Sequence, residues 1–393
     1  MTGRQPFSAI VGLGFSEFSR GDIGTPRDLA IDAVVSAVED CGLGLADLDG
    51  LLICRSPSAP SSELPLRLRL DLGLGDLSLL GDLQLEGASV VGAIQQASLY
   101  LHHGLARTVA CVFSDVPLRP GKASGAASYN RVMQLSGLDD WEVQYGLFGA
   151  AGPYALAAQR YLDRFGLQRS ALGGYAVASR RWASLHPRAM LREPLDLEGY
   201  MHSRSIVDPF CVLDCAYPVN GAVAVILTTV ARAPDLSKPP VYVHAFAQGH
   251  AGRGSFRGNE PEIEAGGALA AAALWRMAGV GPSDVQSAQI YDAFSYVGLQ
   301  ALEDYGLCPR GQAPGFVHDG HTSPGGQLPV NTGGGHLSGF YLQGMTPVSE
   351  AVIQARGEGG ARQVPRNELM LVTGSGGRLD YHAALLVSPR AAL

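Results

Sequence analysis

The sequence has little charge, very little lysine and no long hydrophobic run. Charged residues make up 17% of the 393 positions, and the formal net charge is -7 at pH 7. No Lys/Arg-rich run could neutralise nucleic-acid phosphates, so a nucleic-acid-binding protein is not expected. The apolar runs are broken by Gly, Asp or Ser well before the ~20 residues that a membrane span needs. A soluble protein without a membrane span is therefore predicted.

The sequence also lacks the cysteine patterns of metal sites and disulfide frameworks. It has no CxxC pair and no histidine partners at zinc-finger spacing. The N-terminal segment has no basic region followed by an apolar stretch and a cleavage site, so no secretion signal is indicated. These features predict a cytoplasmic protein without a metal site in this chain. The scattered cysteines are Cys41, Cys54, Cys111, Cys211, Cys215 and Cys308.

Glycine is abundant, with 51 residues, and the hydrophobic content of 46% is enough for a sizeable core. The chain opens with an apolar run from Ser8 to Gly14. Thr25 and Pro26 then form a typical helix start, and apolar residues recur at helical spacing up to Cys41. A strand-like run follows and ends at Cys54. This order predicts a β-α-β opening.

A helix is predicted over 88–103, and the apolar run Thr108–Phe113 is typical of a central strand covered on both faces. The pattern becomes irregular over about 115–209, which indicates an inserted loop domain. Strand and helix patterns then alternate again to the end of the chain. The predicted elements are helices around 155–165, 170–185, 265–278 and 349–356 and strands at 222–229, 241–246, 288–292, 368–373 and 383–387. We therefore predict an α/β protein with pseudo-repeated halves, 1–235 and 236–393.

Several segments, taken in order, resemble the sterol-carrier-protein branch of the thiolase superfamily and its thiolase-like relatives. The resemblance spans nearly the whole chain. It implies the thiolase fold, with two βαβαβαββ halves in a layered α-β-α-β-α arrangement. The segments are Ala9–Gly14, Ala46–Leu52, Asn220–Ile226, Ile290–Phe294, Glu303–Cys308, Pro329–Gly334 and Val372–Gly377.

The residues that carry thiolase chemistry have changed in this chain. In thiolases the nucleophilic cysteine stands at a helix N-terminus, where the dipole favours the thiolate. The matching positions of the two catalytic cysteines are Gly87 and Gly374 here. The Gly-His-Pro motif is replaced by a glycine-rich stretch after Asn331, and Tyr291 replaces a motif histidine. The resemblance therefore does not imply thiolase activity.

The changed pattern resembles the thiolase-like aldolases of steroid side-chain degradation, in which two pocket tyrosines are implicated. Tyr291 and Tyr341 occupy the matching positions. The resemblance implies a lyase that cleaves a β-hydroxyacyl-CoA, of a steroid or bile-acid side chain, to a ketone and a shorter acyl-CoA. It also implies an OB-fold/zinc-ribbon partner, which would hold any zinc, and the fold implies a homodimer. No cofactor is expected, since coenzyme A is part of the substrate.

A retro-aldol cleavage needs a base, an acid and dipoles that stabilise the enolate oxygen. A phenol with a pKa near ~10 is a weak base, so a proton relay is required, and His336 is a candidate. Asp292 and Asn331 are candidates for orienting groups in the pocket. Backbone amides near Gly87, Gly376 and Gly377 are candidates for the oxyanion and substrate-binding site.

Other interpretations of these residues remain open. A tyrosine at an apolar strand end is most often a core residue, and a serine at a helix start, such as Ser89, is most often a cap. The chain could also be an acyltransferase or thiolase with an unrecognised nucleophile. A third possibility is a non-catalytic subunit that binds acyl-CoA or lipid.

Overall fold

The computed structural model describes residues 5–58, 64–118, 143–147, 149–251 and 265–393. The described strands form one nine-stranded sheet in the order β3-β2-β4-β7-β1-β8-β11-β10-β9, and β5 and β6 form a separate two-stranded sheet. The strands are β1 Ser8–Phe15, β2 Gly50–Cys54, β3 Leu79–Leu83, β4 Thr108–Asp115, β5 Ser205–Val207, β6 Phe210–Cys211, β7 Gly221–Thr228, β8 Val241–His250, β9 Ser287–Gln289, β10 Met370–Gly376 and β11 Tyr381–Ser388.

The two halves of the large sheet repeat one topology. In the first half β2 is parallel to β4, while β4 pairs antiparallel with β7 and β7 with β1. In the second half β9 is parallel to β10, while β10 pairs antiparallel with β11 and β11 with β8. Among the described residues, the second half lacks a counterpart of β3. An antiparallel pairing of β1 with β8 joins the halves. The predicted pseudo-repeat is therefore visible in strand order and direction.

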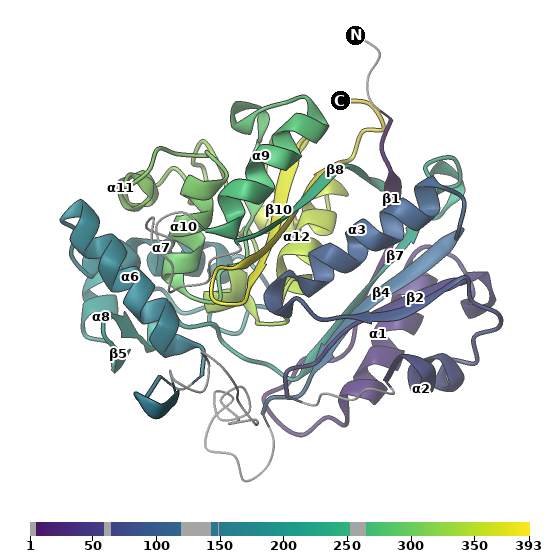
Figure 1. The fold of residues 1–393 in the computed structure, drawn as a ribbon, viewed down its shortest axis with the longest axis horizontal. Coiled ribbons are helices and arrows are strands. Elements are labelled where there is room, and N and C mark those ends of the chain that lie inside the picture. The colour runs from purple at the N-terminus through teal and green to yellow at the C-terminus, as the bar shows by residue number, and fades with distance from the viewer. Residues whose placement is uncertain (1–4, 59–63, 119–142, 148, 252–264) are drawn as a thin grey trace.

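Helices form three layers around the strands. The helices are α1 Pro26–Asp40, α2 Leu64–Asp71, α3 Ser89–His102, α6 Ala151–Phe165, α7 Ser170–Ser184, α8 Leu197–Met201, α9 Gly266–Ala278, α10 Ser295–Asp304, α11 Ala313–His318 and α12 Met345–Ala355. Helices α1 and α2 cover the first half of the sheet, and α9 and α10 cover the second half (Figure 1). Helices α3 and α12 share one core with strands of both halves. The predicted α-β-α-β-α layering and thiolase fold are confirmed.

The local signals for α1 act as expected. Thr25 caps the helix, its hydroxyl accepts a hydrogen bond from the Asp28 amide, and the Asp28 carboxylate accepts one from the Thr25 amide. Pro26 is the first helical residue. The prediction missed α2 and β3. The residues of α2 alternate between apolar and charged along LPLRLRLD, a pattern with period two that does not indicate a helix.

The region 115–209 contributes α6, α7, α8 and β5, one strand of the two-stranded sheet. The apolar faces of α6 and α7 pack with α10 and α11 in the core of the second half. Tyr154, Tyr161 and Tyr175 are buried there. These helices therefore close one end of the second half, next to the residues that the sequence predicts as the site.

Candidate active site

Gly87 lies in the short 3-10 turn Glu86–Ala88 that leads into α3. A Cβ atom at this position would lie 2.1 Å from the Ser375 carbonyl oxygen and 2.2 Å from Cζ of Tyr291. Real Cβ atoms do not approach other atoms so closely. The ring of Tyr291 therefore fills the space into which a side chain at position 87 would project.

Other glycines allow the end of β10 to approach this turn. A Cβ on Gly374 would lie 2.9 Å from the Ala88 Cα, and a Cβ on Gly376 would lie 2.9 Å from the Gly87 nitrogen. Gly377 has a φ of +58°, in the left-handed region that favours glycine. The positions that match both thiolase cysteines, Gly87 and Gly374, are thus in backbone contact.

Tyr291 and Tyr341 are hydrogen-bonded to each other. Their phenol oxygens are 2.9 Å apart. Tyr291 lies two residues after the end of β9, and its amide donates to the Thr373 hydroxyl on β10. The Tyr341 amide donates to the Tyr217 carbonyl. The structure therefore brings the two predicted tyrosines together from separate segments, with Tyr291 against the Gly87 turn.

His336 and Asp292 connect the segments that carry the two tyrosines. His336 lies in the π-helix Gly335–Gly339, and its Nδ1 is 2.7 Å from a carboxylate oxygen of Asp292. The same oxygen accepts a hydrogen bond from the His336 amide. His336 Nε2 donates to the Gln343 carbonyl at 2.7 Å. Both ring nitrogens therefore have partners, which favours an orienting role over a relay.

The imidazole ring of His336 packs against both phenol rings, tilted against Tyr291 and edge-on to Tyr341. Its centroid is 4.6 Å from that of the Tyr291 ring and 5.2 Å from that of the Tyr341 ring. Both His336 and Asp292 are fully buried. His336 therefore packs against both phenol rings, and its hydrogen bonds with Asp292 join the segments that carry the two tyrosines.

Asn331 orients the chain just before Tyr291. Its side-chain oxygen accepts from the Ile290 amide at 2.6 Å, and its side-chain nitrogen donates to the Ile290 carbonyl at 2.9 Å. A third bond joins it to the Tyr175 hydroxyl. Asn331 has a φ of +51°, a conformation that asparagine tolerates better than most residues. Its contacts are those of an orienting group.

The surroundings favour the neutral form of both phenols. Burial raises the pKa of Tyr291 well above its ordinary value, and the neighbouring Tyr341 adds to the rise. Tyr341 keeps part of its side chain exposed, but loss of solvation also raises its pKa, while the hydrogen bond with Tyr291 lowers it. Both groups are therefore proton donors at neutral pH unless a neighbour accepts their protons.

Sequence reasoning missed two groups beside the pair, Glu86 and Tyr154. After burial and Tyr341, both groups raise the pKa of Tyr291 electrostatically. Glu86 also adds to the rise of the Tyr341 pKa that burial causes. Glu86 directly precedes Gly87, so its place in that turn was a usable signal. Tyr154 comes from α6, and no motif marks it.

The alternative nucleophiles are poorly placed. The Ser89 hydroxyl is buried and accepts a hydrogen bond from the Leu85 amide at 2.7 Å, which ties down the turn before α3. Cys111 is buried in β4, and Cys308 is buried in the segment that follows α10. Burial raises the pKa of both thiols, that of Cys308 to about 12. A thiol with a raised pKa is a poor nucleophile.

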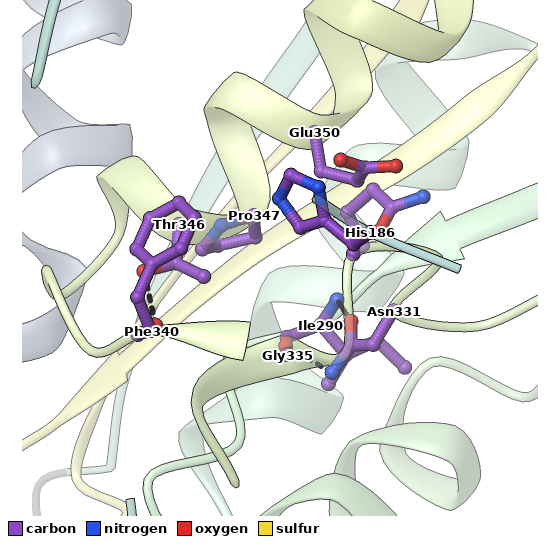
Figure 2. Close-up of a pocket in the computed structure, with 10 residues that line it drawn as sticks. His186, Ile290, Asn331, Gly335, Phe340, Thr346, Pro347 and Glu350 are labelled. Atoms are coloured by element: carbon purple, nitrogen blue, oxygen red, sulfur yellow. Dashed lines mark hydrogen bonds between the residues drawn. The ribbon is translucent and has the colours of Figure 1, made fainter. Parts of the chain in front are cut away.

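A small pocket is lined by Ile290, the residue before Tyr291, together with Asn331, His186 and Glu350 (Figure 2). It has room for little more than a water molecule. Asn331 and Ile290 form one wall, joined by their hydrogen bonds, and His186 and Glu350 lie at the other end. Nδ1 of His186 has no hydrogen-bond partner among the described residues. Burial lowers the pKa of His186 to about 4.

The lowered pKa of His186 predicts a loss of stability in acid. The unfolded chain binds a proton at this histidine near pH 6.5, whereas the folded chain does so only near pH 4. Stability should therefore fall by about 3 kcal/mol as the pH drops through this window. We expect His186→Gln to lose this part of the pH dependence in urea unfolding at pH 7 and pH 4.5. Equal pH dependence in both proteins would contradict the assignment.

The described part of the chain offers no group of three or more His, Cys, Asp or Glu side chains that could hold a metal ion. None of its helices combines the length and apolar character that crossing a membrane requires.

Comparison with known proteins places these features in a family. The "Thiolase C-terminal domain-like" family model matches residues 250–389. The chain is 34% identical over 362 residues to a steroid side-chain-cleaving aldolase of Thermomonospora curvata, covering 89% of this chain and 90% of that protein. It is 32% identical to the 17-hydroxy-3-oxo-4-pregnene-20-carboxyl-CoA lyase of Mycobacterium tuberculosis, covering 89% and 92%.

A solved structure, the Ltp2-ChsH2(DUF35) aldolase, superimposes with a TM-score of 0.87 at 30% sequence identity. The alignment covers 97% of both chains. Sequence and structure therefore agree on one branch of the superfamily. This chain belongs to the thiolase superfamily, in the branch of the thiolase-like steroid side-chain aldolases.

Proposed function

We propose that this protein is a lyase that cleaves a β-hydroxyacyl-CoA of a steroid or bile-acid side chain by a retro-aldol reaction. The products are a ketone and a shorter acyl-CoA, such as propionyl-CoA or acetyl-CoA. The observation that carries the proposal is the hydrogen-bonded phenol pair, whose Tyr291 ring occupies the space of a side chain at position 87. Such a site can transfer protons but has no thiol at the helix end.

The cleavage requires two proton transfers around one carbon–carbon bond. Loss of the β-hydroxyl proton lets the oxygen form a carbonyl, and the electrons of the bond between the α- and β-carbons pass to an enolate. The enolate oxygen is the thioester oxygen, and backbone amides of the Gly87 turn and of Gly376 would stabilise it. The Gly377 amide is not free for this role, because it already donates to the Glu86 carboxylate. A protonated phenol then delivers a proton to the α-carbon.

We assign the base to Tyr341 and the acid to Tyr291. Burial raises the pKa of Tyr341, but the hydrogen bond with Tyr291 opposes this rise, whereas the same bond adds to the rise of the Tyr291 pKa. Tyr341 is also the more exposed of the two. Tyr291 is almost fully buried against the Gly87 turn, where the enolate would form, and its raised pKa suits a proton donor.

The test is turnover of a steroid-type β-hydroxyacyl-CoA by the purified chain, alone and with its partner, followed by detection of the ketone and the shorter acyl-CoA. We expect both products in equal amounts and no thiolysis of a β-ketoacyl-CoA by added coenzyme A. Thiolysis without aldol cleavage would favour an acyltransferase or thiolase. Binding of acyl-CoA without any turnover would favour a non-catalytic subunit.

Thiol alkylation separates the aldolase from a cysteine-dependent enzyme. Five of the six cysteines are buried and the sixth is partly buried. We expect iodoacetamide treatment of the folded protein to leave its kcat within about twofold, because buried thiols react slowly. A stoichiometric loss of activity on alkylation of one cysteine would overturn this expectation.

The quaternary structure belongs to the same proposal. The similar Ltp2-ChsH2(DUF35) aldolase has a second component in its name. On that support we propose an OB-fold/zinc-ribbon partner for this chain, which would hold any zinc. We also propose a homodimer through the central sheets and a cytoplasmic location, and we keep 1–235 and 236–393 as the two halves of the thiolase fold. Co-purification and light scattering of the complex test the two assembly statements.

A further inference from the structure

The tyrosine pair needs an acceptor for the proton that leaves the substrate. The surroundings of Tyr291 and Tyr341 raise the pKa of both phenols, so neither is ionised at neutral pH without help. His336 keeps both ring nitrogens on Asp292 and Gln343. We therefore look for the acceptor among the other described groups near the pair.

Glu86 is a carboxylate in the turn that contacts the Tyr291 ring. It precedes Gly87, whose Cα faces the Tyr291 ring. Its Oε2 accepts a hydrogen bond from the Gly377 amide at 2.6 Å, which fixes the carboxylate against the end of β10. Glu86 has a φ of +48°, which is uncommon for a residue other than glycine. Strained backbone of this kind is found preferentially at functional sites.

Tyr154 is a third phenol of the same site. Only 6% of its surface is exposed. Burial raises the pKa of Tyr154, and the nearby Glu86 and Tyr341 add to the rise, while hydrogen bonds from the backbone amides of Leu379 and Arg378 oppose it. Arg378 and Leu379 both have positive φ and belong to the turn between β10 and β11. This one turn therefore holds both the Glu86 carboxylate and the Tyr154 hydroxyl.

Solvent access distinguishes Glu86 from the other carboxylate near the pair. Asp115 also raises the pKa of Tyr341, but it is buried, and one of its oxygens already accepts hydrogen bonds from the Ser56 and Ser58 hydroxyls. Glu86 is exposed, so a proton that it accepts can exchange with bulk water.

We propose that Glu86 is the proton acceptor of the Tyr291–Tyr341 pair and that Tyr154 positions it. As Tyr341 takes the β-hydroxyl proton, its own phenol proton passes to the Glu86 carboxylate, directly or across a water molecule. Tyr291 gives its proton to the α-carbon of the enolate. Glu86 then returns a proton to Tyr291 through the 2.9 Å bond between the phenols, so each turnover leaves the proton count unchanged. This inference rests on the proposed retro-aldol function.

The test is Glu86→Gln in the full chain, assayed with its partner. Glutamine keeps an oxygen that can accept from the Gly377 amide but cannot take a proton. We expect kcat to fall about 10²-fold with KM within about threefold, as for removal of a general base. The acidic limb of the pH–rate profile should disappear, and added formate should restore part of the rate. The groups that face Glu86 are the three phenols, with Arg378 and Asp380 in the adjoining turn.

Two further variants separate a proton-transfer role from a structural one. Tyr154→Phe keeps the ring contact with Phe294 but removes the hydroxyl, and we expect kcat to fall about tenfold, with a fall in melting temperature no larger than that of Tyr161→Phe. Tyr161→Phe removes another buried hydroxyl from α6, one that bonds to Glu303. It should lower the melting temperature while leaving kcat unchanged.

The outcomes keep this inference separate from the retro-aldol function itself. If Tyr341→Phe is inactive while Glu86→Gln retains the wild-type kcat and pH profile, the role of Glu86 is disproved and the function stands. A slow Glu86→Gln enzyme with an unchanged pH profile and no response to formate would also disprove it. Absence of aldol cleavage by the wild-type complex would instead refute the function.

Discussion

Tyr341→Phe is expected to lower kcat for retro-aldol cleavage by about 10²- to 10⁴-fold, the range that general acid–base groups contribute. The phenylalanine ring keeps the shape of the tyrosine but removes both the base and the hydrogen bond to Tyr291. KM for the acyl-CoA should change little, because the ring contacts with His336 remain. Steady-state kinetics of the purified complex measure both constants.

Tyr291→Phe should show a comparable loss of kcat with a different pH dependence. Removal of the acid slows protonation of the enolate. Exchange of the α-protons of the shorter acyl-CoA product with deuterated water should therefore be lost together with cleavage. Tyr100→Phe serves as the control, because Tyr100 lies near the far end of α3. Wild-type rates in both Tyr291→Phe and Tyr341→Phe would rule out the phenol mechanism.

Gly87→Ala is expected to be the most damaging single substitution in the turn before α3. The new Cβ would lie 2.1 Å from the Ser375 carbonyl oxygen and 2.2 Å from Cζ of Tyr291, so the ring has to leave its position. We expect a loss of stability of about 1–3 kcal/mol from overpacking. We also expect kcat to fall at least about 10²-fold, because displaced reacting groups lose alignment.

Gly75→Ala is the control for Gly87→Ala. It adds the same methyl group where no atom lies within 4 Å, and it should leave activity and stability unchanged. In a Tyr291→Ala background, Gly87→Ala should cost less stability than in the wild type, because one of its two obstacles is gone. Equal costs in both backgrounds would show that the ring does not occupy this space.

Much of the fold could be predicted because the pattern of apolar residues follows the elements. The Thr25–Pro26 helix start and the apolar run at Thr108 are local signals, and both elements form as expected. The helix α10 escaped prediction because every one of its residues is buried, which leaves no polar face to define a helical period. Tertiary packing, rather than local pattern, decides such elements.

Some residues of the candidate site could be predicted from the sequence, and others depend on the folded structure. Tyr291 and Tyr341 were predicted from motif positions, and the structure brings them into contact. The competition between the Tyr291 ring and a side chain at position 87 could not be predicted, because it depends on distances between segments 204 residues apart in the chain. Tyr154 escaped for the same reason, since only folding places α6 beside the turn after β10.

The steric competition at position 87 also restricts how such a site could arise from a thiolase by single substitutions. A chain with a cysteine at 87 has no room for the Tyr291 ring as it is packed here, because the Cβ and the ring would overlap. The side chain at 87 must therefore be lost before the tyrosine can enter. Once the tyrosine is in place, a cysteine restored at position 87 would clash with the Tyr291 ring and would not restore thiolase activity. The replacement of the cysteine by the tyrosine therefore has a required order, and no single substitution reverses it.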